Sequence, residues 1–251
     1  METLDRISGA IRRRLPLRWQ LTVRKLKNRG TWRGTSLADP LKLIWVRPQD
    51  IRYSVKAFDR MAYMGRILDG DWDLKISAVD EKPIYGGLRE RYVDGRDWEE
   101  TAYYRIFAER FSQRPGMPVW GYSSIQEFEQ RLVFLDRLYR SILDQGYRTQ
   151  LECGPAAQDP VRHGSERDAH LRTHEVGCNI GRAGAFLLNS GIHRLAIAQI
   201  LGLERFPIQV VVRHAEWQKL RESISPRDDL DPVPRSGDIA LHPDLQDLCK
   251  E

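Results

Sequence analysis

The segment from residue 175 to residue 214 constrains the fold most, because its hydrophobic pattern changes from extended to helical and back again. Residues 176–180 and 185–188 are apolar runs of strand length, and Arg182-Ala183-Gly184 between them is typical of a turn. Asn189-Ser190-Gly191 ends the second run. The sequence therefore predicts a β-hairpin that is followed at once by a different element.

A helix is predicted directly after Gly191. Apolar residues recur at spacings of three and four between Ile192 and Leu201, and Gly202 supplies a stop that is typical of a helix C-terminus. The β-branched run from Phe206 to Val212 then predicts a further strand. Strand, helix and strand in this order favour a right-handed crossover, so we expect a unit of that kind.

The junction between the second strand and this helix favours an anion site. Gly191 lets the backbone approach a ligand, and the first helical turn presents N–H groups that have no partner within the helix. His193 and Arg194 fall in that turn, where cations oppose the helix dipole unless a negative charge lies nearby. We expect Ser190, Gly191, His193 and Arg194 to hold a phosphate-bearing ligand. The alternative is that Arg194 pairs with a carboxylate of the core.

The residues around this junction resemble the ParB/sulfiredoxin superfamily. The resemblance is carried by Leu188-Asn189-Ser190-Gly191-Ile192-His193-Arg194-Leu195-Ala196-Ile197-Ala198, by Leu201-Gly202-Leu203 and by Phe206-Pro207-Ile208-Gln209-Val210. It implies an α+β fold, a mixed α/β domain with a small mixed sheet and flanking helices. Members of this superfamily bind nucleotides or their phosphates at this turn, and they include ParB-type CTP switches, ATP-dependent sulfiredoxins and small-molecule kinases.

The resemblance implies a nucleotide cofactor, ATP or CTP, bound with Mg²⁺. The first hypothesis is a nucleotide-dependent enzyme, an ATP-dependent small-molecule phosphotransferase or kinase whose acceptor is unknown. The alternative is a non-catalytic, nucleotide-responsive binding module of ParB type that associates with nucleic acid or with a membrane. Ile192 stands where sulfiredoxins carry their reactive cysteine, so repair of sulfinic acid is not expected.

Phosphoryl transfer requires carboxylates that hold a divalent metal and a group that positions the acceptor hydroxyl. Asp69, Asp71 and Asp73 lie close together in the sequence and are the predicted Mg²⁺ ligands, with Asp71 also predicted to assist catalysis. Glu175, at the start of the hairpin, and His193 are the other predicted catalytic residues. Two structural alternatives stay open, because Asp-Gly turns are common in proteins and Glu175 could pair with an arginine.

Positive charge is concentrated in a basic N-terminal arm, residues 1–40. Arginines and lysines from Arg12 to Arg29 are interleaved with leucine, valine and tryptophan. This mixture is typical of segments that bind nucleic acid or an anionic membrane surface, so either is a predicted partner. The alternative is a helix that packs its apolar stripe on the body of the protein.

The remainder of the chain divides into a main domain and a tail. Residues 41–224 are predicted to form the ParB/sulfiredoxin-like domain, with strands near 41–46 and 51–55 and an insertion at 56–170. Within the insertion, Ser124 and Glu127 at one end and Gly146 at the other predict a long amphipathic helix. Residues 225–251, rich in proline and aspartate, are predicted to be a loosely ordered C-terminal tail.

Composition excludes several classes of protein. Hydrophobic residues make up 41% of the chain, and no apolar run approaches the roughly 20 residues of a transmembrane helix. No apolar signal segment accompanies the first arginines, and the three widely spaced cysteines favour free thiols over disulfides. The sequence therefore predicts a cytoplasmic protein without a transmembrane segment.

Overall fold

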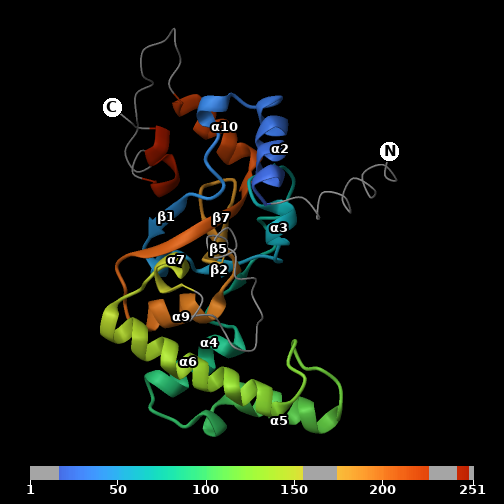
Figure 1. The fold of residues 1–251 in the computed structure, drawn as a ribbon, viewed down its shortest axis with the longest axis vertical. Coiled ribbons are helices and arrows are strands. Elements are labelled where there is room, and N and C mark those ends of the chain that lie inside the picture. The colour runs from blue at the N-terminus through green and yellow to red at the C-terminus, as the bar shows by residue number, and fades with distance from the viewer. Residues whose placement is uncertain (1–16, 155–173, 226–241, 249–251) are drawn as a thin grey trace.

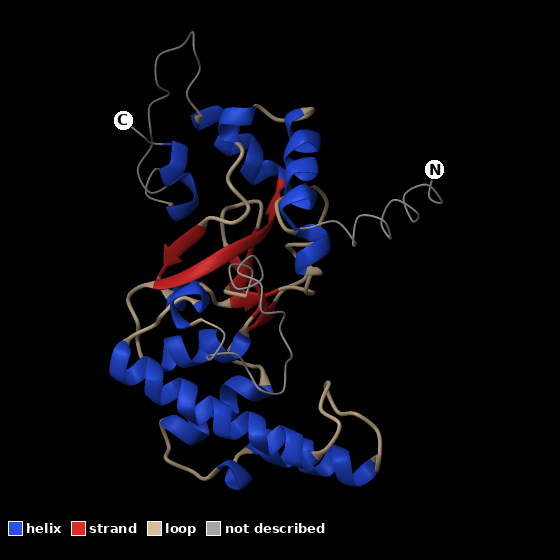
Figure 2. Cartoon of the chain, in the orientation of Figure 1, coloured by secondary structure: helices blue, strands red, loops and turns tan. Residues whose placement is uncertain are grey.

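The structure is a computed structural model that describes residues 17–154, 174–225 and 242–248. In these residues an open, mixed sheet of seven strands runs through the middle, and helices lie on both sides of it (Figure 1, Figure 2). The mixed α/β class predicted from the sequence is therefore confirmed. The strands are β1 (Leu43–Val46), β2 (Tyr53–Ser54), β3 (Arg66–Leu68), β4 (Ser77–Ala78), β5 (Val176–Ile180), β6 (Phe186–Ser190) and β7 (Phe206–His214).

The centre of the sheet is built by the segment that the hydrophobic pattern singles out. The strand order is β1-β7-β5-β6-β2-β4, and β3 pairs with the end of β7 that β1 leaves open. β5 and β6 form the predicted antiparallel hairpin, with Gly177 opposite Ser190 and Ile180 opposite Phe186. β7 runs parallel to β5, so β5 is paired on both sides and its side chains are all buried.

Capping residues fix where several helices begin and end. The α-helices are α2 (Leu17–Arg29), α3 (Arg60–Tyr63), α4 (Pro83–Tyr92), α5 (Ala102–Gln113), α6 (Ile125–Gln145), α7 (Gln150–Cys153), α9 (Ile192–Ile200) and α10 (Ala215–Ile224), and the 3-10 helices are η1 (Gly34–Ser36), η2 (Pro48–Asp50), η3 (Trp98–Glu100) and η5 (Pro243–Leu248). Ser124 accepts a hydrogen bond from the backbone N–H of Glu127, and Gly146 ends α6 with a positive φ. The prediction of this long helix is confirmed.

The predicted right-handed crossover from β6 through α9 to β7 is wrong. β5 lies between these two strands, and β6 and β7 are antiparallel because β5 is antiparallel to one and parallel to the other. The handedness rule concerns parallel strands, so it does not govern this connection. The hydrophobic pattern located each element but held no information about their order in the sheet.

α9 lies between two hydrophobic cores. Leu195 and Ala198 pack into the core of the sheet, together with residues of β1, β5, β6 and β7. Ala196 and Ile197 pack into a second core, which belongs to the helical layer formed by α4, α5 and α6 (Figure 1). All four side chains are fully buried, so α9 joins the sheet to the helical layer.

α10 is held by segments from both ends of the described chain. Arg221 of α10 is fully buried and donates to the backbone carbonyls of Ser36 and Asp244. The Asp244 carboxylate in turn accepts hydrogen bonds from Arg213 of β7 and Trp217 of α10. Residues 243–248 are therefore packed on the domain, which corrects the loosely ordered tail predicted there. The rest of that predicted tail, 226–241 and 249–251, lies outside the described residues.

The predicted basic arm is described from residue 17 onward, where it forms α2, and residues 1–16 lie outside the described residues. Leu21 of α2 packs with Met64 and with the half-buried Leu41 and Met61. α2 therefore contacts the body of the domain. None of the described helices combines the length and the apolar character needed to cross a bilayer.

Candidate functional site

The junction between β6 and α9 has the backbone geometry that an anion site requires. Gly191 has φ 94° and ψ 30°, in the left-handed region, and no described side chain caps the N-terminus of α9. A Cβ atom at this position would lie 2.9 Å from Cγ2 of Val176, so the turn needs glycine for space as well as for conformation. The backbone N–H groups in the first turn of a helix have no acceptor within the helix itself, which is why helix N-termini of this kind bind anions.

Arg194, in the first turn of α9, forms an ion pair with Glu175 inside the protein. Its Nη1 lies 3.5 Å from Oε2 of Glu175 and donates to the Tyr147 hydroxyl at 3.3 Å, while its Nη2 donates to the carbonyl of His174. The Glu175 carboxylate is 1% exposed and also accepts a hydrogen bond from the backbone N–H of Gln150. The alternative that the sequence left open, a core carboxylate paired with Arg194, is therefore present.

A second arginine, Arg60 of α3, lies against the same junction. Its Nη2 donates to the backbone carbonyl of Glu175, and a Cβ atom added to Gly177 would lie 2.5 Å from this nitrogen. Burial, together with the positive charge of Arg194, lowers the pKa of Arg60 to about 10, so the group stays charged at neutral pH. Sequence reasoning missed Arg60, because 115 positions separate it from Glu175 and its own segment has only a weak helical pattern.

Ser190, the last residue of β6, adds a hydroxyl to this junction. Its Oγ is buried and makes no hydrogen bond within the described residues. Gly177 pairs with Ser190 across the hairpin, and a Cβ atom at Gly177 would lie 2.8 Å from this oxygen. A buried hydroxyl without an acceptor costs about 1–3 kcal/mol, which a bound acceptor would remove. His193, also predicted to bind phosphate, is half-buried in the first turn of α9.

Asn189 positions Arg60 through the loop before α3. Its Oδ1 accepts a hydrogen bond from the N–H of Phe58 at 2.7 Å, and its Nδ2 donates to the Phe58 carbonyl at 3.1 Å. Asn179 of β5 donates to the same Oδ1 at 3.2 Å. These two hydrogen bonds to the backbone of Phe58 hold the loop in place two residues before Arg60. Asn189 is thus a structural support of the site that sequence reasoning did not assign.

The acids predicted to hold Mg²⁺ lie at the other end of the hairpin. Asp71 and Asp73 pair with Arg182, in the turn between β5 and β6, at 2.9 Å and 2.8 Å. Gly191 follows the far end of β6, so the structure does not bring Asp71 to the turn at which its catalytic role is predicted. The Asp69 carboxylate accepts a hydrogen bond from the backbone N–H that follows it. Among the described residues, no three His, Cys, Asp or Glu side chains form a group suited to a metal ion.

The pKa shifts of Asp73 and Glu175 agree with structural roles. Burial would raise the pKa of Asp73, but the hydrogen bonds from Arg182 outweigh it and hold the pKa below its ordinary value. Burial raises the pKa of Glu175, and the charge of Arg194 opposes this rise. Glu175 therefore holds the two arginines, and its contacts within the described chain give no geometric support to the predicted catalytic role.

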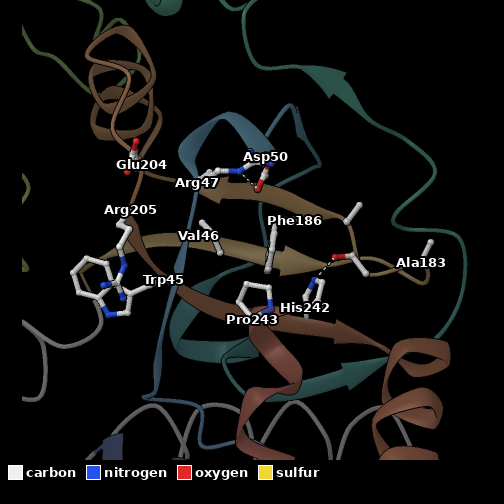
Figure 3. Close-up of a pocket in the computed structure, with 12 residues that line it drawn as sticks. Trp45, Val46, Arg47, Asp50, Ala183, Phe186, Glu204, Arg205, His242 and Pro243 are labelled. Carbon is white, nitrogen blue, oxygen red and sulfur yellow. Dashed lines mark hydrogen bonds and ion pairs between the residues drawn. The ribbon is translucent and has the colours of Figure 1, made fainter. Parts of the chain in front are cut away.

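A separate cavity of about 580 Å³ opens beside the first residues of β6. Arg205 lies over the ring of Trp45, 5.3 Å from its centroid, at one end of this cavity (Figure 3). At the other end, Nε2 of His242 donates to the carbonyl of Gly184 at 3.0 Å. None of the predicted site residues, all of which lie in the described chain, lines this cavity. It is therefore distinct from the junction at Gly191.

Comparisons with protein-family models, with curated proteins and with solved structures found no match to this chain. The relationship to the ParB/sulfiredoxin superfamily therefore stays a prediction from the residues of β6, α9 and β7. The function has to be inferred from the groups that meet where α9 begins.

Proposed function

We propose that this protein binds the phosphate groups of a nucleotide at the N-terminus of α9. The observation that carries the proposal is the convergence of Arg60 and Arg194 on the turn at Gly191, where the helix adds the positive end of its dipole. Ser190 adds a hydroxyl donor at the same place. The resemblance to a superfamily whose members bind nucleotides at this turn supports the same ligand.

Charge repulsion between the two arginines favours an anionic ligand. The positive charge of Arg194 contributes to the lowered pKa of Arg60, which means that each guanidinium raises the energy of the other. The Glu175 carboxylate already relieves part of this repulsion. A phosphate group would relieve more of it, because phosphate carries negative charge and accepts several hydrogen bonds at once.

The reaction that we propose is phosphoryl transfer from ATP, with Mg²⁺ on the nucleotide, to a hydroxyl of a small molecule. The bond between the terminal phosphorus and its bridging oxygen breaks and releases ADP, a bond from that phosphorus to the acceptor oxygen forms, and the acceptor proton passes to solvent water. Arg60, Arg194 and the N–H groups of α9 would hold the transferred group.

One observation favours a second candidate, a nucleotide-responsive binding module without turnover. Asp71 and Asp73 pair with Arg182 at the opposite end of the hairpin, and Glu175 is enclosed by its own hydrogen-bond donors. A carboxylate that positions an acceptor hydroxyl would have to lie next to the terminal phosphate. The two candidates share the phosphate site and differ in whether nucleotide is consumed.

Ser190→Ala tests the phosphate site with little risk to the fold. Because the hydroxyl makes no hydrogen bond within the described chain, its removal should leave the free energy of unfolding unchanged or slightly higher. We expect the Kd for ATP or CTP to rise about tenfold, the loss of one hydrogen bond to a charged group. Isothermal titration calorimetry with each nucleotide, with and without Mg²⁺, measures the Kd.

Arg47→Gln is the matched control for Arg60→Gln. Arg47 is exposed and pairs with Asp50, so its substitution should leave the Kd unchanged, whereas Arg60→Gln should raise it more than Ser190→Ala does. Binding of nucleotide by Ser190→Ala and Arg60→Gln with wild-type Kd would show that the phosphate site is wrong. Steady consumption of ATP identifies the phosphotransferase, and binding without consumption identifies the module.

A further inference from the structure

The helix α2 is attached to the domain by its polar side. Arg24 donates to the backbone carbonyls of Met61 and Met64. Asn28 donates to the backbone carbonyl of Gly65 at 2.9 Å. Leu21, which is 7% exposed, is the buried apolar side chain of α2 on this side. A surface helix usually buries its apolar residues and exposes its polar ones, so the orientation of α2 is the reverse of the usual one.

The opposite side of α2 carries two large apolar side chains in solvent. Trp19 is 64% exposed and Leu26 is 60% exposed. They are two helical turns apart, so they lie on the same side of the helix, with the exposed Thr22 between them. α2 lies along the margin of the molecule in Figure 1.

Basic residues border this apolar strip. Lys25, Lys27 and Arg29 are exposed, and α2 contains no acidic residue. At about 100° per residue, Lys27 lies on one side of the strip and Arg29 on the other. An apolar strip between rows of positive charge is the pattern of helices that lie in a membrane interface.

From this arrangement we infer that α2 docks the protein on an anionic lipid membrane, with its axis in the plane of the surface. Trp19 and Leu26 enter the boundary between headgroups and acyl chains, while Lys25, Lys27 and Arg29 contact lipid phosphates. A nucleic acid would satisfy the cations and could stack on Trp19, but it offers Leu26 no apolar partner. An anionic membrane offers an apolar phase to Trp19 and Leu26 and phosphate groups to the cations. The docking does not depend on the proposed nucleotide site.

Flotation of the full chain with lipid vesicles tests this inference. We expect binding to phosphatidylcholine vesicles that contain about 30 mol% phosphatidylserine, and weaker binding to phosphatidylcholine alone or at high salt. The double variant Trp19→Ser/Leu26→Ser should bind the mixed vesicles at least about tenfold more weakly, because both apolar anchors are lost. Lys25→Gln/Lys27→Gln should lose about tenfold on the mixed vesicles and little on the neutral ones.

Val133→Ser/Leu143→Ser on α6 is the matched control, since these side chains are 58% and 57% exposed. It should bind vesicles like the wild type, and thermal melts followed by circular dichroism should agree for all variants. Wild-type binding by Trp19→Ser/Leu26→Ser, or equal affinity for neutral and mixed vesicles, would overturn the inference. Binding to polynucleotide in place of vesicles, or a dimer that this variant dissociates, would also overturn it.

Discussion

At the scale of single residues, two clusters of buried charge in the described chain bear on the site and on stability. One is the junction at which Arg60 and Arg194 meet Glu175. The other is Asp244, which is 1% exposed and lies between Arg213, at 3.0 Å, and Arg221, at 3.2 Å. A carboxylate between two buried guanidinium groups is stabilised in its charged form, so Asp244 should link the stability of the fold to pH.

Acid should weaken the fold through Asp244. Burial would raise its pKa, but the charges and hydrogen bonds of Arg213 and Arg221 outweigh this and lower the pKa to about 2, from an ordinary 3.8. Because the folded pKa lies below the unfolded one, the carboxylate stabilises the fold above about pH 4, and this contribution is lost as the pH falls towards about 2. Its size is about 2 kcal/mol, which urea titrations across this pH range measure.

Asp244→Asn isolates this contribution. The variant should lack that part of the pH dependence. At neutral pH its free energy of unfolding should be about 3–5 kcal/mol lower, because the buried Arg213 loses its carboxylate partner and Arg221 keeps only that of Asp247. Asp50→Asn removes an exposed partner of Arg47 and should cost less than about 1 kcal/mol. A pH profile of Asp244→Asn parallel to that of the wild type would contradict the assignment.

At the scale of elements, the connection between β6 and α9 depends on the conformation of Gly191. Gly191 and Gly202 flank α9, and both have positive φ, but only at Gly191 would a Cβ atom meet a neighbour, Val176. We expect Gly191→Ala to cost more than about 2 kcal/mol and Gly202→Ala about 1 kcal/mol. Chemical denaturation measures both, and equal losses would show that space at Gly191 is not limiting.

Elements with local signals could be predicted from the sequence, and those without could not. The hairpin, α9 and α6 were located by their periodicity and by Ser124, Gly146 and Gly191, all of which act within a few residues of the chain. The place of Arg60 in the site depends on Asn189 and Phe58, which are 131 positions apart. No pattern within one segment encodes a contact of that range.

At the scale of the whole molecule, α9 packs into both the sheet core and the helical layer, so we expect the two to unfold as one cooperative unit. Ile197 faces the helical layer and is fully buried, so Ile197→Ala should cost about 2–4 kcal/mol. We expect hydrogen exchange to rise together in α6 and in β5, since α9 packs against both layers. Exchange that rises in α6 while β5 stays protected would show that the helical layer unfolds by itself.

The fold class was predicted from the sequence, but the order of the strands in the sheet was not. Hydrophobic runs indicated a mixed α/β domain, whereas the order β7-β5-β6 and the pairing of Asp71 and Asp73 with Arg182 depend on how distant segments meet. The same is true of the phosphate site, for which the sequence supplied Gly191 and Arg194 but not the second arginine. The sequence indicated which residue types could bind phosphate, but it did not indicate which of them lie close together in the fold.

The attachment of α10 to both flanking segments bears on how the chain folds as it is synthesised. Arg221 contacts Ser36, 185 positions earlier, and Asp244, 23 positions later. A nascent chain that has reached α10 can already make the first contact but still lacks the carboxylate that neutralises this guanidinium. Until residue 244 leaves the ribosome, the interior beside α10 lacks this carboxylate, so the packing of α10 can be completed only after that residue has emerged.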